Sequence, residues 1–150
     1  MYHLAYICEN GHPVDVISDY CVDRYCTQCG APIIFQCPIC GETINGMEHD
    51  CSGSYVVPSY CRGCGNPLPW TDRAAQATAE LLAEDENITT DEANKLVDVF
   101  PDIITETPRT QLAVVRLKKA MKNLGSFAAE ALKQFVLDFG CELVKRQLGL

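Results

Sequence analysis

Three copies of one short unit constrain the fold of this chain more than any other feature of its sequence. In each copy two cysteines are separated by two residues and followed by a glycine, at residues 26–30, 37–41 and 61–65. This spacing lets the chain reverse so that both sulfurs face one ion, and the glycine can adopt a left-handed conformation that a β-carbon disfavours. A disulfide framework has no reason to repeat such detail. The three units therefore predict metal-binding knuckles.

A fourth ligand pair is needed, because zinc prefers four ligands and three pairs fall one pair short of two sites. Cys8 and His12, with Gly11 between them, can bend onto one ion. A surface histidine beside a turn is the alternative interpretation. The sequence predicts two Zn²⁺ ions per chain. The eight predicted ligands are Cys8, His12, Cys26, Cys29, Cys37, Cys40, Cys61 and Cys64.

The sequence leaves three ways to pair these ligands. In the sequential pairing, which we favour, the first four hold one ion and the last four hold the other, as in a zinc ribbon. In the interleaved pairing alternate pairs share an ion, as in a RING-type cross-brace, although the linker between Cys29 and Cys37 is longer than RING domains usually have. The third pairing joins the two middle pairs and leaves the outer pairs together.

The ligand types bear on the metal and on catalysis. Iron competes with zinc, because paired knuckles also build rubredoxin sites; the histidine favours zinc in the first site, and the all-cysteine site suits either ion. Four protein ligands make a closed, structural site, whereas a catalytic zinc keeps one position open for water. We therefore predict no catalytic residue and no enzymatic activity. The sequence leaves open whether Cys21, His49 and Cys51 have a role. Cys21 could replace Cys8 or His12 as a ligand. Cys51 lies near His49, and the two could bind an ion or react, although a loop residue that faces solvent or packs under the ribbon is the favoured interpretation.

Cysteine usage also divides the chain. Nine of the ten cysteines precede residue 65, and this part has too few large aliphatic residues to hold a core by burial alone. We predict a zinc-binding ribbon or knuckle domain over residues 1–72. Short alternating runs predict strands or hairpin arms at residues 14–17, 33–35 and 55–57, and Asn45-Gly46 predicts a turn.

The remaining residues, 73–150, show a helical period and predict an all-α domain of about four helices. Capping residues predict helices that start near Thr71, Thr89, Thr107 and Ser126, and the last extends to about residue 148. The helix over 126–148 has a broad apolar face. Either the other helices cover this face, or it mediates self-association or docks another protein.

Net charge and the lack of a visible targeting pattern limit the classes of partner that the sequence favours. Residues 1–72 contain eight acidic and two basic residues, a net charge of −6, which is a poor match for a phosphate backbone. The predicted helix over 109–122 carries one basic cluster, for which a solvated helix face is the default interpretation; contact with nucleic acid or with an acidic metal-binding half is the alternative. Its members are Arg109, Arg116, Lys118, Lys119 and Lys122. No basic leader and no apolar run of about 18 residues is visible, which predicts a cytoplasmic chain with reduced thiols and no membrane span.

The full pattern resembles a known family. It runs from Cys8-x3-His12 through the three knuckles, then Pro69-Trp70-Thr71, then residues 107–110 before a Lys118-Lys119 helix. This string is similar to a bacterial zinc-ribbon family classed only as a domain of unknown function. The resemblance implies a cytosolic bacterial protein with zinc-ribbon knuckles and a helical tail, and carries no activity. We predict a structural zinc-binding adaptor for a protein partner; the alternatives are a nucleic-acid-binding regulator and, less favoured, a RING-like ligase component.

Overall fold

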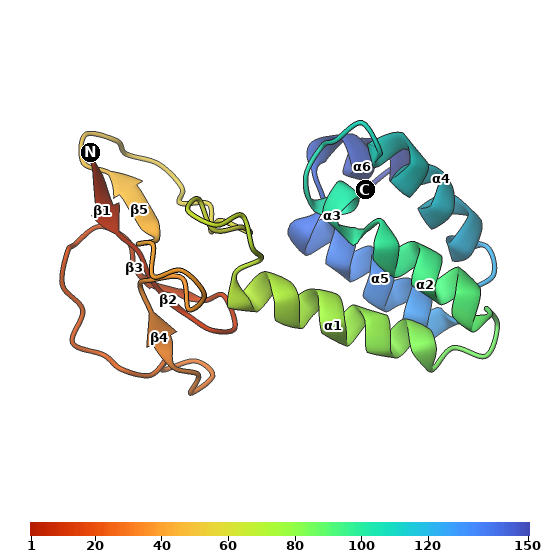
Figure 1. The fold of residues 1–150 in the computed structure, drawn as a ribbon, viewed down its shortest axis with the longest axis horizontal. Helices are drawn as coiled ribbons and strands as arrows, with labels where there is room; N and C mark the ends of the chain where they lie inside the picture. The colour runs from red at the N-terminus through yellow and green to blue at the C-terminus, as the bar shows by residue number, and fades with distance from the viewer. The chain divides into compact units, whose positions relative to one another are not determined.

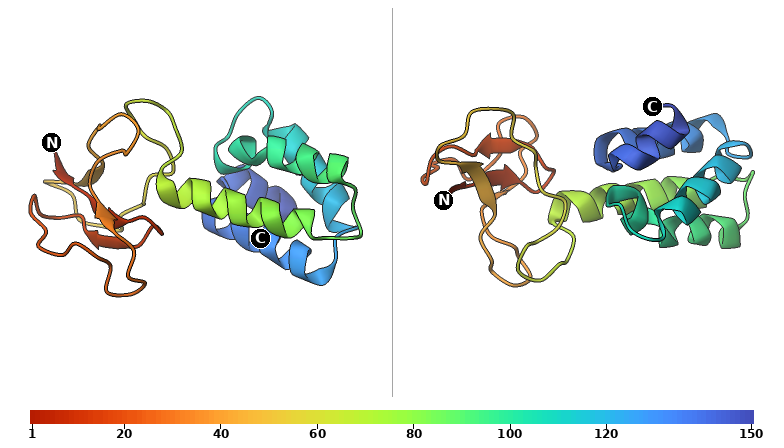
Figure 2. Two further views of the ribbon diagram at one scale, coloured as in Figure 1. Left: turned by 60° about the horizontal axis from the view of Figure 1, so that its bottom comes forward. Right: turned by 90° about the horizontal axis from the view of Figure 1, so that it is seen from above.

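The computed structural model describes all 150 residues, which form two compact units, Met1–Arg73 and Ala74–Leu150. Short strands and long irregular connections make up the first unit, whereas the second is helical (Figures 1 and 2). Helix α1 (Pro69–Ala83) begins in the first unit and ends in the second. None of the helices combines the length and the apolar character that a membrane span requires.

Two small antiparallel sheets organise the first unit. Strand β1 (Tyr2–Leu4) pairs with β5 (Asn45–Glu48). Strand β2 (Tyr6–Cys8) lies between β3 (Pro13–Asp15) and β4 (Ile33–Ile34). The few large apolar side chains buried here, such as Ile7 and Leu68, make a small core, so the sheets mainly position the loops around them.

Two sequence predictions are wrong in this unit. Asn45-Gly46 lies within β5 instead of forming a turn, because Gly46 is needed for close packing: a β-carbon there would lie 2.5 Å from the carbonyl oxygen of Val16. The predicted strand at residues 55–57 is irregular. Tyr55 is instead fixed by its hydroxyl, which donates to the Asn45 carbonyl oxygen at 2.6 Å, and Val56 points to solvent.

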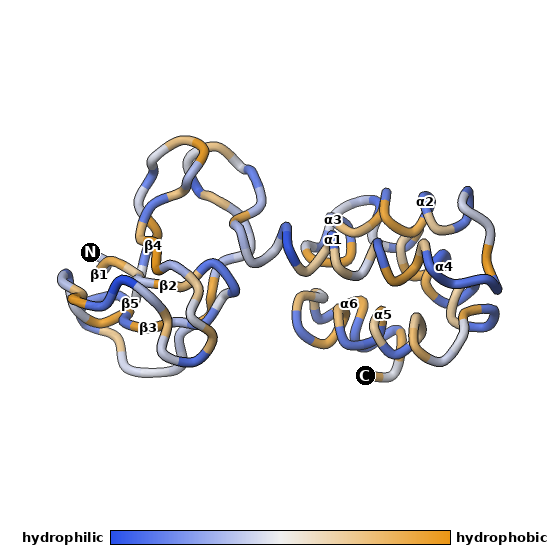
Figure 3. Tube along the Cα trace, turned by 90° about the horizontal axis from the view of Figure 1, so that it is seen from below, coloured by the Kyte–Doolittle hydropathy of each residue, from blue (hydrophilic) through white to orange (hydrophobic).

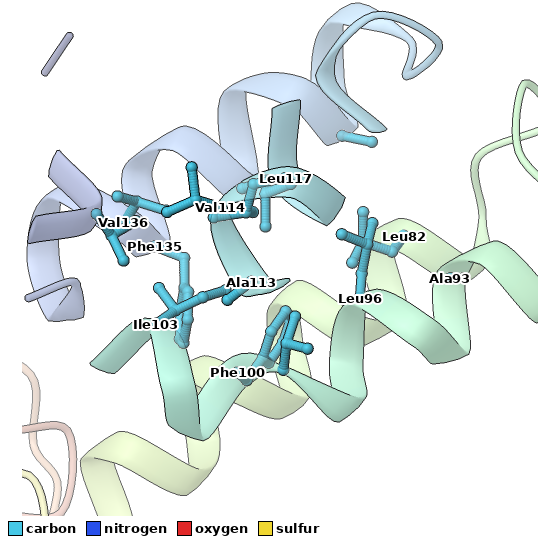
Figure 4. Packing of buried hydrophobic residues seen from close by; sticks show 14 residues of the cluster. Leu82, Ala93, Leu96, Phe100, Ile103, Ala113, Val114, Leu117, Phe135 and Val136 are labelled. Atoms are coloured by element: carbon cyan, nitrogen blue, oxygen red, sulfur yellow. The ribbon is translucent and has the colours of Figure 1, made fainter. Parts of the chain in front are cut away.

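Five further helices or helical turns follow α1 in the second unit: α2 (Thr90–Asp98), α3 (Phe100–Ile104), α4 (Thr110–Met121), α5 (Ser126–Phe139) and α6 (Glu142–Leu148). Hydrophobic and hydrophilic residues alternate along these helices (Figure 3). Side chains from α2, α3, α4 and α5 converge in one core, where the rings of Phe100 and Phe135 lie 4.8 Å apart (Figure 4). Burial of apolar surface therefore holds this unit together.

The helical region has six helices where the sequence predicted about four. Pro101 sits near the start of short α3, a position that tolerates its missing N–H. The predicted helix over 126–148 breaks at Gly140, whose backbone is extended. A β-carbon at Gly140 would lie 2.4 Å from the Val136 carbonyl oxygen, and the Cys141 N–H donates to the Ile103 carbonyl oxygen at 2.8 Å. This break lets α6 pack against α4.

One of the predicted helix caps is confirmed. Thr89 and Glu92 form the predicted capping box at the start of α2: each side chain bonds the backbone N–H of the other residue, at 3.2 and 2.8 Å. Ser126 is not a cap; the preceding Gly125 N–H donates to the carboxylate of Asp85 at 2.9 Å.

The apolar face of residues 126–148 is largely covered within the chain. Its inward residues lie in the core of the second unit; they are Ala128, Leu132, Phe135, Val136 and Val144. Phe127 points to solvent, and Leu137 is partly exposed. Self-association or partner docking through this segment stays a prediction.

Candidate metal centres

The three knuckles share one backbone geometry. In each, the glycine has a positive φ and its N–H donates to the carbonyl oxygen of the first cysteine; for Gly30, Gly41 and Gly65 the φ values are 74°, 79° and 73° and the distances 2.8, 2.9 and 2.9 Å. The N–H of each first cysteine donates to the carbonyl oxygen of the residue after the glycine. The first cysteine of each knuckle is buried and the second is exposed. The repeated sequence thus produces a repeated turn.

Cys8 and His12 belong to a shortened version of this turn. The Gly11 N–H donates to the Cys8 carbonyl oxygen at 2.8 Å, and the Cys8 N–H donates to the His12 carbonyl oxygen at 3.0 Å. Each bond spans one residue fewer than in the knuckles. Gly11 has a φ of 91°, so the left-handed residue precedes the second ligand instead of following it. Trp70 packs directly against Gly11, leaving no room for a β-carbon.

The first cluster joins this turn to the first knuckle. Cys8 Sγ lies 3.4 Å from His12 Nδ1 and 3.7 Å from Cys29 Sγ. Cys26 Sγ lies 3.7 Å from His12 Nδ1. All four ligand atoms lie within 4.8 Å of one another, so one ion can contact them all.

The second cluster joins the other two knuckles. Cys37 Sγ lies 3.8 Å from Cys64 Sγ, and Cys40 Sγ lies 3.5 Å from Cys61 Sγ. These four sulfurs also lie within 4.8 Å of one another. The structure therefore groups the eight predicted ligands in sequential order. It brings together neither the interleaved pairs of a RING-type cross-brace nor the two middle pairs.

Polar donors surround the sulfurs of both clusters. The His12 N–H lies 3.3 Å from Cys8 Sγ, and the amide of Asn10 donates to Cys29 Sγ at 3.4 Å. Arg73 in turn donates to the Asn10 side-chain oxygen at 2.8 Å and pairs with Glu9. The second cluster repeats the arrangement, since the amide of Asn66 donates to Cys64 Sγ at 3.4 Å. Such outer donors orient metal ligands and stabilise thiolates.

Hydrogen bonds and the crowding of thiols shift the cysteine pKa values in opposite directions. A hydrogen bond from the Ala31 backbone, helped by Asn10, lowers the pKa of Cys29 to about 6. A hydrogen bond from the Asn66 side chain lowers the pKa of Cys64 to about 6. The Glu42 backbone N–H also favours the Cys40 thiolate, but desolvation and three neighbouring thiols outweigh it and raise that pKa to about 12. The four sulfurs of the second cluster lie too close to one another to ionise all together without a cation between them.

The donor sets fit bound metal ions. Three sulfurs with one imidazole, and four sulfurs, are the ligand sets of structural zinc sites, and both are complete without water. The ions would be held by the eight residues named above. The knuckles are zinc-ribbon-like, while the identity of the ion is a prediction from the ligand chemistry.

The spare cysteines lie outside both clusters. Cys21 is partly buried and points its thiol at the Asp23 carbonyl oxygen at 3.8 Å. Cys51 is exposed, and its thiol donates to the Glu48 carboxylate at 3.3 Å. Cys141 packs at the edge of the helical core. None of the three substitutes for a predicted ligand.

One group of ligand-type side chains was missed by the sequence reasoning. His49, considered earlier only with Cys51, instead stacks on His3 beside Asp19. These three residues come from distant parts of the sequence and share no spacing pattern. Only the pairing of β1 with β5 brings the two histidines together.

The predicted basic cluster is partly neutralised. Arg109 and Arg116 both pair with Asp98, at 2.8 and 3.3 Å. Lys119 faces a hollow of about 520 Å³ with Arg116, whereas Lys118 lines a different hollow. The cluster therefore offers less free positive charge than its sequence indicated, and nucleic-acid binding stays a prediction.

Comparison with known proteins places the chain in a family. No curated protein and no solved structure shows significant similarity to it. The family model for DUF2321, described as an uncharacterized protein conserved in bacteria, matches residues 1–148. Because the match covers nearly the whole sequence, knuckles and helices alike, the chain belongs to the bacterial family DUF2321.

Proposed function

We propose that this chain is a structural zinc-binding adaptor whose first unit docks onto another protein. The two clusters support a structural role for metal, because each offers a complete set of four protein ligands. A closed site contributes rigidity instead of chemistry. The functional surface of the unit must then be the backbone and side chains that the ions hold in place.

The observation that carries the proposal is an apolar loop (residues 17–25), which connects β3 to the first knuckle. Four large side chains in it point to solvent: Ile17, Tyr20, Val22 and Tyr25 are 66%, 75%, 72% and 62% exposed. Exposed apolar patches mark protein-binding surfaces, and tyrosine is enriched among the residues that contribute most to binding. Isolated exposed side chains would need no such explanation.

The apolar loop is held in shape without being buried. The carboxylate of Asp15 accepts bonds from the Ile17 N–H, the Ser18 N–H and the Ser18 hydroxyl at 3.0, 3.1 and 2.5 Å. The Tyr6 hydroxyl donates to the Asp19 carbonyl oxygen at 3.0 Å. A loop fixed in this way loses little conformational entropy on binding, which favours affinity.

Charge indicates the chemistry of the partner. The loop contains two acidic residues, Asp19 and Asp23, against one basic residue, Arg24, and residues 1–72 carry a net charge of −6. Complementary potentials speed association and exclude wrong partners. We therefore expect a protein with an apolar pocket rimmed by lysine or arginine, and not a phosphate backbone.

The test combines capture with reconstitution. The zinc-loaded 150-residue chain is cross-linked in a bacterial lysate, the captured proteins are identified, and each is purified and titrated calorimetrically. We expect the double variant Tyr20→Ala/Val22→Ala to weaken binding at least about tenfold, the effect of losing roughly 1.4 kcal/mol at a hot spot. Val56→Ala, which trims an 82% exposed side chain outside the loop, is the matched control and should bind normally.

Three outcomes would count against the adaptor. Capture that is equal for the wild type and the loop variant would show that the apolar loop is not the docking surface. Retrieval of RNA or DNA in place of protein would favour the nucleic-acid alternative. A native mass showing a dimer that Phe127→Ala dissolves, with no other protein bound, would assign the binding surface to the segment 126–148.

A further inference from the structure

We propose a third, open metal site in the first unit, formed by His3, Asp19 and His49. Their ligand atoms lie within 4.8 Å of one another, the same limit that the two cysteine clusters meet. Two imidazoles and a carboxylate are a ligand set for divalent first-row transition ions. The inference does not depend on the adaptor role, because it concerns ion binding alone.

Strand pairing places the two histidines together. Tyr2 lies opposite Glu48, and the His49 N–H continues the ladder by donating to the Met1 carbonyl oxygen at 3.0 Å. His49 therefore lies opposite Met1, and His3 is its diagonal neighbour on the same face. The rings stack with their centroids 3.8 Å apart and their planes 23° from parallel.

A bulge and a loop complete the arrangement. Between the two paired positions β5 has one residue more than β1, since Tyr2 pairs with Glu48 and Leu4 pairs with Asn45. Such bulges re-aim side chains and recur next to functional sites. Asp19 approaches from the apolar loop, and its Oδ1 accepts a bond from the Leu4 N–H at 3.2 Å. Its other carboxylate oxygen forms no bond of this kind, so it is available to an ion.

His3 supplies a second observation that points to a ligand. Its Nδ1 is inaccessible to solvent and has no hydrogen-bond partner, although it lies 3.4 Å from Asp19 Oδ1. A buried imidazole nitrogen without a partner is costly, because its interaction with water is lost and not replaced. An ion held between this nitrogen and the carboxylate would remove that cost.

The chemistry of the site differs from that of the cysteine clusters. Three protein ligands leave at least one position for water, as in catalytic zinc sites, whereas both cysteine clusters are closed. Asp19 and His49 are exposed, so solvent reaches the site. With fewer ligands and no thiolate, the third site should bind more weakly than the clusters, fill last and empty first.

Cobalt titration tests the proposal on the full chain, prepared without a polyhistidine tag. Co²⁺ bound by thiolates gives intense charge-transfer absorption, and Co²⁺ bound by nitrogen and oxygen does not. We expect this absorption to saturate at two equivalents and a third equivalent to bind afterwards without increasing it. Titration of Zn²⁺ into protein already holding two ions should likewise show one further site by calorimetry.

Two variants assign the third ion to its ligands. His49→Phe keeps an aromatic ring to stack on His3 but removes a ligand, and Asp19→Asn keeps the oxygen that accepts from the Leu4 N–H. Each should weaken the third equivalent at least about tenfold, since even outer-shell changes cost that much. Asp50→Asn, next to His49 in the sequence, is the matched control and should leave all three equivalents unchanged. The first two equivalents report that the unit is folded.

Two results would overturn the proposal. One is zinc-loaded protein that takes up no third equivalent of either ion in millimolar excess. The other is a third equivalent that persists in both His49→Phe and Asp19→Asn, which would place the ion elsewhere. In either case stacking alone would account for the histidine pair.

Discussion

The two units of this chain are nearly equal in length, with 73 and 77 residues, but their interiors are filled differently. In the helical unit, fourteen buried apolar residues form one cluster, and every helix contributes at least one of them. In the first unit, cysteine ligands account for much of the buried apolar set, and one of its clusters consists of Cys8, Cys26 and Ala31 with Ile33 at its edge. Two units of similar size can thus be stabilised in different ways: one by a core of apolar side chains, the other by predicted ion sites.

The sharpest test of this comparison is chelation. Removing metal from the reduced chain should unfold the first unit, because zinc binding in small structural sites supplies about 10–16 kcal/mol of apparent free energy. The helical unit should keep its circular dichroism and its protected amides. Amide-resolved NMR before and after chelation measures both units at once. A first unit that keeps its dispersed signals with no metal left would break the comparison.

Truncation of a core side chain should destabilise the helical unit and leave the metal clusters intact. Leu132 is fully buried in the helical unit, and Leu132→Ala should lower its free energy of unfolding by about 2–5 kcal/mol through lost contacts and a cavity. Metal content should not change. Denaturant titration followed by helical signal gives the loss, and Leu137→Ala, at a partly exposed position on the same helix, should cost much less.

Gly11→Ala tests the shortened turn of the first cluster. Gly11 has a positive φ, and a β-carbon would lie 2.9 Å from the β-carbon of Trp70. The left-handed conformation alone costs about 1–2 kcal/mol, and the clash adds to it. Gly11→Ala should therefore weaken metal binding by the first cluster. The chain has a single tryptophan, so its fluorescence during chelator competition measures this loss of affinity directly.

The control is Gly41→Ala in the second cluster. Gly41 has a φ of 79° but no atom near its β-carbon position, so this variant carries the conformational cost alone. Equal losses in the two variants would mean that the contact with Trp70 contributes nothing.

A smaller effect is expected at the start of α2. Thr89→Ala removes half of the capping box and should destabilise the helical unit by about 1 kcal/mol. Thermal unfolding of metal-loaded protein measures it. Thr90→Ala, inside the first turn and outside the cap, should leave the melting temperature nearly unchanged.

The smallest expected effect is the loss of stability of the helical unit at low pH. Hydrogen bonds from Arg109 and then Arg116 lower the pKa of Asp98 below its ordinary value of 3.8. Because the folded pKa is lower, the stabilisation is present above about pH 4 and is lost as the pH falls through the folded value. Carbon-detected NMR titration of the side chain should give a midpoint below 3.8. The stability gap between wild type and Asp98→Asn, read from helical signals, should shrink in acid.

The metal-ligand clusters could be predicted from the sequence in more detail than the fold around them. The C-x2-C-G spacing fixes a local turn whatever surrounds it, so each knuckle could be predicted from five residues. Cys8 and His12 were found because two clusters require an even number of pairs. The sequential grouping was favoured but not decided, since it depends on how β2 and β4 pair, which no local pattern encodes.

The failures share one cause, which is tertiary contact overriding a local signal. Gly46 belongs to a typical turn dipeptide, but the close approach of Val16 requires a glycine in a strand. Gly140 sits in a continuous helical period, yet the contact of Cys141 with Ile103 ends the helix there. The grouping of His3, Asp19 and His49 arises only when β1 pairs with β5, strands that are about forty residues apart in the sequence.

The position of the second cysteine in each knuckle determines how these centres would be damaged. Cys29, Cys40 and Cys64 meet solvent, while the first cysteine of each pair is covered. An oxidant or electrophile would therefore attack the outer sulfur first, and a single modified atom would leave its ion with three ligands. Loss of the ion and collapse of the loop it supports would follow from chemistry at one exposed atom.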